Sequence, residues 1–566
     1  MSSKVTQEFE ESGRSVGLVV LLHAYTLSPE SLIYVRNIVR TTLPDADIFT
    51  PHLPASTFSL ANPVAVVCDL MDKIDAYWDK QKYENIIIVG HSLGALLGRK
   101  LYIYACGETP EAPFEVGVHN RIKRDWAEKV DRIILLAGMN RGWSISHHMS
   151  IPKAITFTLG AALGEVITWI KKRRPLILSI RRGAPFLTNL RIQWLAMRRA
   201  TLSSRAGHAI TIQLLGSIDD CVGPEDNIDL VSGADFVYID VGKSGHANII
   251  DMDTSTVGQE RKQKFILALT ANRQVLDNHC VLPQDTELLT KRTDVTDVIF
   301  VMHGIRDLGY WTHKIARRVK SLGKVNHRVF ETETSSYGYF PMLSFLFPWR
   351  RRAKVEWLMD QYAEGLAQYP NATFSYIGHS HGTYLLAKAL KDYPCCRFKH
   401  VVFAGSVVRT DYDWSNHLKT GRVKGILNYV ATADWVVAWF PNALQMLGFQ
   451  DLGSAGHRGF DSDKPNQIRY VKGAHSAALN EDNWDAIASF VIYGTPVNPP
   501  NKIIESKQAV WVSLPSRVAP LIWLGMALFL LWLGSMLLPG LTPDQWKKTL
   551  IFLFYLYGIY LALTKL

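Results

Sequence analysis

The sequence has little cysteine, and several common motifs are missing from it. Six cysteines are scattered through 566 residues without C-x-x-C spacing, which argues against a zinc site or a disulfide framework. A reducing compartment is the simplest expectation. No G-x-x-x-x-G-K-[ST] motif occurs, which excludes a phosphate-loop enzyme on pattern. The N-terminus is polar and acidic where a secretory signal would be basic and then apolar, so we expect a cytoplasmic body.

Charged residues make up only 20% of the chain, against 48% hydrophobic residues, a balance that argues against disorder. A chain of this length predicts two domains and perhaps an appendage. The net charge of +11 could serve nucleic acid or an anionic membrane. No helix-turn-helix, RRM or zinc-finger pattern accompanies the basic runs, so we expect no nucleic-acid partner.

The C-terminal region contains the longest uncharged run. Residues 518–538 carry no charge and are long enough to cross a bilayer, which predicts a transmembrane helix. A turn-forming segment and a shorter apolar run, 550–564, follow. Residues 516–566 are therefore interpreted as a membrane-anchoring hairpin, with one span plus an interfacial helix as the alternative. The basic residues on the two sides are nearly balanced, so they set no orientation.

The same order of elements occurs twice upstream. Apolar runs at 17–25 and 297–305 each reach a His followed by a small residue, and a helical pattern follows each run. Segments 85–104 and 373–393 then each give a β-rich run, a Gly-flanked Ser and a helix. This alternation predicts two α/β domains with mostly parallel sheets covered by helices, at 15–275 and 295–495.

GHSLG around Ser92 predicts a nucleophile on a strained turn between a strand and a helix. The N–H of Leu93 would face the developing oxyanion, and Ala24 and Tyr25 of the HAY segment are the candidates for the second donor. Chain order then calls for an acid and a histidine. The acid is assigned to Asp219, with Asp220 a close rival and Asp226 a distant one. The general base is His246, in a Gly-bordered loop after the next strand.

GHSHG around Ser380 repeats this pattern in the second half. Gly304 and Ile305 of the HGI segment, with His381 after the nucleophile, are the predicted oxyanion residues. Asp434 opens a D-x-x-V pattern, as Asp219 does, and is the predicted acid. The predicted base is His475. The alternative is that one half is a degenerate copy retained for packing.

These motifs resemble the α/β-hydrolase superfamily over about 15–275 and 295–495. The first half, with GHSLGALLGRKL and VDRIILLAGMNRGW, is similar to lipase-like and GPI inositol-deacylase-like members. The resemblance implies ester or amide hydrolysis through an acyl-enzyme intermediate, without metal or organic cofactor. It implies no particular substrate, because the fold hosts many. HAY departs from the more usual HG of the family.

An insert at about 141–205 in the first half is strongly basic. Its last 35 residues, 171–205, contain ten Lys or Arg and no Asp or Glu. Segment 337–354 in the second half also places arginines after aromatic residues. Such a cap predicts contact with an anionic lipid surface, and the alternative is ordinary cap packing with a solvated charged face.

The sequence thus predicts a membrane-anchored serine ester hydrolase that acts on lipid or lipid-like acyl esters. Two alternatives stay open. One is a tethered esterase or thioesterase on soluble substrates, and the other is a membrane scaffold or lipid-binding protein with one or both hydrolase domains inactive. The lipid bilayer is the expected partner, and the motifs say nothing of oligomeric state.

Overall fold

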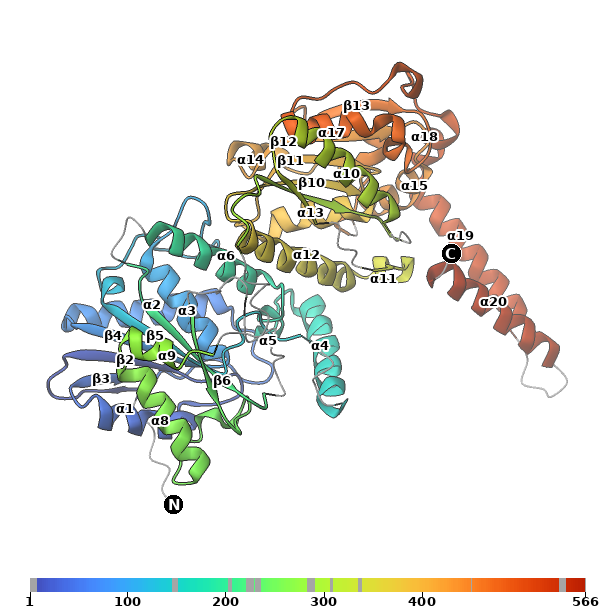
Figure 1. Ribbon diagram of the computed structural model, residues 1–566. Coiled ribbons are helices and arrows are strands. Elements are labelled where there is room, and N and C mark those ends of the chain that lie inside the picture. Colours follow the sequence, from blue (N-terminus) through green and yellow to red (C-terminus); the bar gives the residue numbers. More distant parts are fainter. Residues whose placement is uncertain are drawn as a thin grey trace. The chain divides into compact units, whose positions relative to one another are not determined.

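The protein is described by a computed structural model that covers residues 8–144, 151–201, 206–219, 229, 236–281, 291–305, 309–333, 338–448, 450–538 and 546–564 (Figure 1). The chain divides into two compact units. Unit 1 consists of Met1–Lys291, Met359–Gln368 and Tyr393–Cys395. Unit 2 consists of Arg292–Leu358, Tyr369–Asp392 and Cys396–Leu566.

Unit 1 contains a seven-stranded sheet in the order β1-β3-β2-β4-β5-β6-β7. Every neighbouring pair is parallel except β1 with β3. The strands are β1 (Phe9–Glu10), β2 (Gly17–Leu22), β3 (Ala46–Phe49), β4 (Asn85–His91), β5 (Val130–Leu136), β6 (Ile210–Gly216) and β7 (Phe236–Val241). The central strands are almost wholly buried, as a parallel sheet with two covered faces requires.

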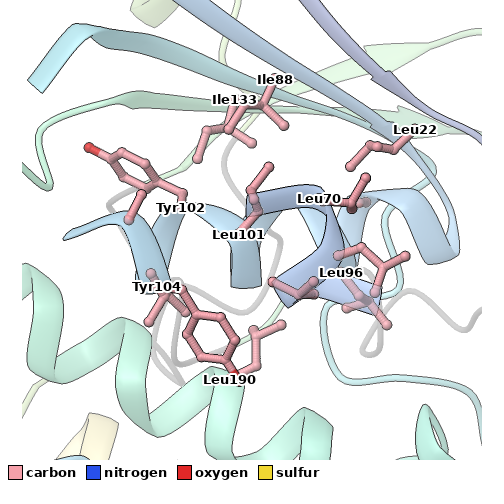
Figure 2. Close-up of a cluster of buried hydrophobic side chains, with 14 of the residues drawn as sticks. Leu22, Leu70, Ile88, Leu96, Leu101, Tyr102, Tyr104, Ile133 and Leu190 are labelled. Atoms are coloured by element: carbon pink, nitrogen blue, oxygen red, sulfur yellow. The ribbon is translucent and has the colours of Figure 1, made fainter. Parts of the chain in front are cut away.

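Helices supply the apolar layers on the faces of this sheet. The helices of unit 1 are α1 (Ile33–Thr42), α2 (Pro63–Lys80), α3 (Leu93–Cys106), α4 (Ile151–Lys171), α5 (Leu176–Ser179), α6 (Pro185–Ala200), α8 (Thr256–Thr270) and α9 (Arg273–Asn278). Figure 2 shows Leu101 of α3 directed toward the sheet residues Ile88 and Ile133, and Leu96 on the side of the helix away from the sheet. Because α3 is buried on nearly every side, the residue at its N-terminus is rigidly held.

Unit 2 contains a six-stranded sheet, wholly parallel, in the order β13-β12-β11-β10-β8-β9. Its strands are β8 (Asp297–Met302), β9 (Phe330–Glu333), β10 (Thr373–His379), β11 (Phe398–Ala404), β12 (Val423–Ala431) and β13 (Asn466–Val471). When the edge strand β1 is set aside, the two sheets have the same strand order, element by element. The prediction of a mixed α/β fold with parallel sheets is therefore confirmed.

The helices of unit 2 include the C-terminal pair. They are α10 (Tyr310–Val325), α11 (Met342–Leu346), α12 (Pro348–Gln368, shared with unit 1), α13 (His381–Asp392), α14 (Trp414–Lys419), α15 (Trp435–Met446), α16 (Ala455–Arg458), α17 (Trp484–Tyr493), α18 (Val510–Ser516), α19 (Ala519–Leu537) and α20 (Trp546–Thr564). Among the described residues, α19 is the one helix long and apolar enough to cross a membrane, with a mean hydropathy of 1.9.

Helix α19 is packed against the body of unit 2. The Phe440 ring of α15 lies 5.1 Å from the Trp523 ring of α19 between centroids. Just before α19, the Asn442 side chain donates a hydrogen bond of 2.7 Å to the carbonyl oxygen of Ser516, the last residue of α18. Helix α20 lies beside α19, where the Tyr555 hydroxyl donates to the Leu530 carbonyl oxygen. Helix α20 begins at Trp546, four residues before the apolar run that starts at 550, and its first turn includes Lys547 and Lys548.

Candidate active sites

Ser92 stands on a sharp turn between β4 and α3. Its backbone is strained, with φ of 53° and ψ of −110°, and its N–H donates a 3.0 Å hydrogen bond to the Leu136 carbonyl oxygen. The two flanking glycines allow this turn. A Cβ on Gly94 would lie 2.1 Å from the Leu22 carbonyl oxygen, and a Cβ on Gly90 would lie 2.4 Å from the backbone of Gly94. The spacing of G-x-S-x-G thus reflects steric limits.

We expect Gly94→Ala to destabilise unit 1 by about 1–3 kcal/mol, because the new methyl group would meet backbone and could not be relieved by a rotamer change. Hydrogen exchange of peptides from β2 and α3 measures the loss. The control is Gly160→Ala on α4, where nothing lies within 4 Å and the helix should gain about 0.5–1 kcal/mol. Equal protection in the two variants would contradict the steric account.

Three side chains in unit 1 form a hydrogen-bonded series. The Ser92 hydroxyl lies 2.8 Å from His246 Nε2, and His246 Nδ1 lies 3.0 Å from Asp219 Oδ2. Nδ1–H donates to the carboxylate in this arrangement, which leaves Nε2 free to accept the serine proton. The structure thus brings Ser92, His246 and Asp219 together. Asp220 and Asp226 lie outside the described residues.

His91 supports the loop that carries the histidine. Its Nε2–H donates a 2.8 Å hydrogen bond to the His246 carbonyl oxygen. Complete burial lowers the pKa of His91 to about 4, so the ring stays neutral at physiological pH. A neutral ring so close to His246 adds no charge that would oppose formation of the imidazolium there.

His23 holds the predicted oxyanion segment. The Leu53 N–H donates to Nε2 of His23 at 2.9 Å, so Nδ1 carries the proton and donates to the Ala24 carbonyl oxygen at 2.9 Å. Among the described residues, no protein acceptor is hydrogen-bonded to the N–H of Tyr25 or of Leu93. Both N–H groups therefore keep their capacity to donate, as the predicted oxyanion role requires, while the Ala24 carbonyl is turned to the histidine.

The second site has the same parts in a different arrangement. Ser380 has φ of 51°, and its N–H donates a 3.0 Å hydrogen bond to the Ala404 carbonyl oxygen. Asp434 is fully buried, and both of its carboxylate oxygens lie 3.0 Å from His475 Nδ1. Burial alone would raise the pKa of Asp434, but His475 and the Val437 N–H lower it below its ordinary value.

Within the described residues, no hydrogen bond joins Ser380 to His475. The His475 ring lies against Gly405, where a Cβ would be 2.7 Å from Cε1 and 2.8 Å from Nδ1. Unit 1 has Ala137 at the corresponding position, directly after β5. The His475 ring therefore occupies space that a methyl group would fill in unit 1, and in this position it is hydrogen-bonded to Asp434 and not to Ser380.

The predicted oxyanion residues of unit 2 lie in different surroundings. Gly304 lies directly against the nucleophile, since a Cβ there would be 2.8 Å from Ser380 Cβ. Its carbonyl oxygen lies 2.8 Å from His303 Nδ1, which repeats the contact of His23. Ile305 ends the described part of this loop. The His381 ring is buried and stacked on Phe340, with 4.8 Å between centroids, and burial lowers its pKa well below the ordinary value.

No family model matches the sequence, and no curated protein matches it. Solved structures with partial likeness are α/β-hydrolases at low identity. The Bacillus licheniformis lipase BlEst2 has 14% identity, covering 45% of this chain and 93% of that chain, with a TM-score of 0.28. The monoacylglycerol lipase of Paleococcus ferrophilus has 13% identity, covering 47% of this chain and 95% of that chain, with a TM-score of 0.29. The phospholipase PlaB of Legionella pneumophila has 11% identity, covering 47% of this chain and 62% of that chain, with a TM-score of 0.28.

The sequence motifs assigned no role to the supporting histidines, although the His that ends each first apolar run was recognised as a repeated feature. His91 and His379 fill the variable position before each serine, and His23 and His303 precede the oxyanion residues. Their repetition at matching positions in both halves is the signal that could have identified them. His379 Nε2 lies 3.3 Å from the Ser476 hydroxyl, next to His475, so it too contacts the loop of the base.

The basic insert contains both buried and exposed cations. Arg191 of α6 is fully buried and donates to both carboxylate oxygens of Asp229, at 2.9 and 2.7 Å, and to Asp360 at 2.5 Å. Arg182 also donates to Asp360, at 2.9 Å. Residues 171–173 are exposed. The ten cations therefore do not form a single solvated face.

Proposed function

We propose that the chain is a membrane-anchored serine ester hydrolase that acts on acyl esters of lipids or lipid-like molecules. The observation that carries the proposal is the hydrogen-bonded series from Ser92 through His246 to Asp219. The strained serine backbone supports the same chemistry, as do the N–H groups of Tyr25 and Leu93, which donate to no acceptor among the described residues. The apolar helix α19, packed on unit 2, is the proposed anchor. Both units are proposed to lie on the cytoplasmic side.

The mechanism follows from the geometry. Ser92 Oγ attacks the ester carbonyl carbon while its proton passes to His246 Nε2, and Asp219 stabilises the imidazolium. Tyr25 and Leu93 N–H groups stabilise the tetrahedral oxyanion. The intermediate collapses, the carbon–oxygen bond to the alcohol breaks, and His246 returns the proton to the departing oxygen. Water then attacks the acyl-enzyme with His246 as base, which releases the acid and restores Ser92.

Unit 2 has two candidate functions. Ser380, His475 and Asp434 would form a second hydrolytic site if the His475 ring turned toward the serine. The alternative is a unit that binds lipid without hydrolysing it, since among the described residues His475 is hydrogen-bonded to Asp434 and not to Ser380. In either case the proposed anchor α19 packs on α15, whose first turn is capped by Asp434 of the second site.

A fluorophosphonate probe tests both sites in the full chain. We expect Ser92 to be labelled at least ~10-fold faster than Ser380, because an engaged general base accelerates such reactions by about 10²–10⁴-fold. Mass spectrometry of labelled peptides from the wild type, Ser92→Ala and Ser380→Ala identifies the reacting serine. No labelling of either serine would overturn the hydrolase proposal. Hydrolysis of short soluble esters without any gain on micellar lipid esters would overturn its lipid substrate.

A further inference from the structure

Helix α4 has an uncovered apolar face. The exposed large apolar side chains on it are Ile155, Leu159, Leu163, Val166, Trp169 and Ile170, between 47% and 66% exposed. At 100° per residue they form one stripe along the helix. We infer that this stripe of unit 1 inserts into the headgroup region of an anionic membrane, with the neighbouring arginines binding lipid phosphate. The inference rests on the proposed function, whose lipid substrate it would bring to the Ser92 unit.

The opposite side of α4 is packed, which fixes the stripe outward. The Phe157 ring lies 5.2 Å from the Trp143 ring between centroids; Trp143 belongs to the main apolar core of unit 1, and Phe157 is partly buried against it. A Cβ on Gly164 would lie 2.9 Å from the Leu178 side chain. Glu165 is buried and forms an ion pair of 3.8 Å with Arg181. The helix therefore cannot rotate its exposed stripe inward without breaking these contacts.

Charge at the end of the stripe matches an anionic surface. Residues 171–174 are four consecutive cations, and no acidic residue occurs between 171 and 205. Lys172 lies over the ring of Trp169, 5.8 Å from its centroid. Amphipathic helices at membrane interfaces bury such apolar side chains below the headgroups while the basic side chains contact the phosphates. This complementarity favours an anionic lipid surface over another protein as the occupant.

A cavity lies at the basic end of the stripe. It has a volume of about 610 Å³ and is lined by Leu60, Ala61, Asn62, Pro63, Arg173, Arg174 and Ser179. Guanidinium groups bind phosphate with two parallel hydrogen bonds, so this pair of arginines suits a phosphodiester. Leucine, alanine and proline supply an apolar wall. The combination suits the boundary between a lipid headgroup and its glycerol backbone.

Photo-crosslinking tests the inference in the full chain, reconstituted into vesicles. The variant Leu159→p-benzoylphenylalanine reports the stripe, and the same substitution at Val116, 97% exposed on a loop of unit 1, is the matched control. Both are made with Ser92→Ala and Ser380→Ala, so the readout needs no hydrolysis. The vesicles are phosphatidylcholine alone or mixed with phosphatidylglycerol.

We expect several-fold more lipid adduct at 159 than at 116, and more with phosphatidylglycerol than without it. Adding Arg173→Gln and Arg174→Gln should remove the phosphatidylglycerol preference and leave the adduct itself. An adduct joining 159 to residues 292–566, or none above the control, would overturn the inference. Loss of the preference on adding inorganic phosphate would overturn the lipid source. None of these outcomes depends on esterase activity, so failure of the proposed function is seen separately, in the fluorophosphonate assay.

Discussion

His246→Ala is expected to slow ester hydrolysis by unit 1 about 10⁴-fold. His246 Nε2 is 2.8 Å from the Ser92 hydroxyl, and no other described side chain is hydrogen-bonded to that hydroxyl. Without the imidazole the serine stays protonated and attacks poorly, while the oxyanion donors and substrate contacts remain. The rate of fluorophosphonate labelling at Ser92 measures the loss directly and excludes any contribution from Ser380.

Two further variants make this result specific. Asp219→Asn should cause a comparably large loss, since an amide nitrogen facing Nδ1 favours the wrong imidazole tautomer. His279→Ala removes an exposed histidine after α9 and should leave the labelling rate unchanged. A His246→Ala protein that labels at Ser92 within threefold of the wild type would show that another group acts as base.

Local sequence was sufficient to predict the parallel sheets and the two nucleophile turns. The glycines around Ser92 and Ser380 are imposed by contacts with the adjacent strand and helix, so the motif itself encodes the turn. Chain order gave candidate acids and bases because strands of a parallel sheet all end at the same edge. These features need no knowledge of distant packing.

The place of the His475 ring could not be predicted in this way. Its position depends on Gly405, 70 residues earlier in the chain, where unit 1 has Ala137. Both halves carry the same Ser, Asp and His pattern, so the motifs are equally complete while the geometry differs. His381 illustrates the same limit, because its ring packs among aromatic side chains of unit 2 that lie far away in sequence.

The basic insert was the least predictable region. Residues 171–205 contain ten Lys or Arg and no Asp or Glu, but the acidic residues that pair with Arg191, Asp229 and Asp360, lie 38 and 169 residues away in the sequence. A local count of charge therefore mixed exposed cations with buried ones. The exposed apolar stripe of α4 precedes the basic run and becomes visible only when the packed face of that helix is known.

Arg191→Ala is expected to destabilise unit 1 by about 3–5 kcal/mol, because it leaves buried carboxylates without their main partner. Urea unfolding, followed by hydrogen exchange in α6 and β6, measures the change. Arg191→Met keeps most of the side-chain volume and should lose nearly as much, which separates the ion pairs from packing. Arg173→Ala, on an exposed cation, should stay within about 0.5 kcal/mol of the wild type.

The pH dependence identifies the cause. Burial alone would raise the pKa of Asp360, but Arg191, Arg141 and Arg182 lower it below its ordinary value. A carboxyl group with a lowered pKa stabilises the fold above the unfolded pKa of about 3.9, and this contribution is lost as pH falls toward the folded value. Arg191→Ala removes part of this lowering, so its deficit should shrink as pH falls from about 5 toward the folded value, and a deficit independent of pH would assign the loss to packing.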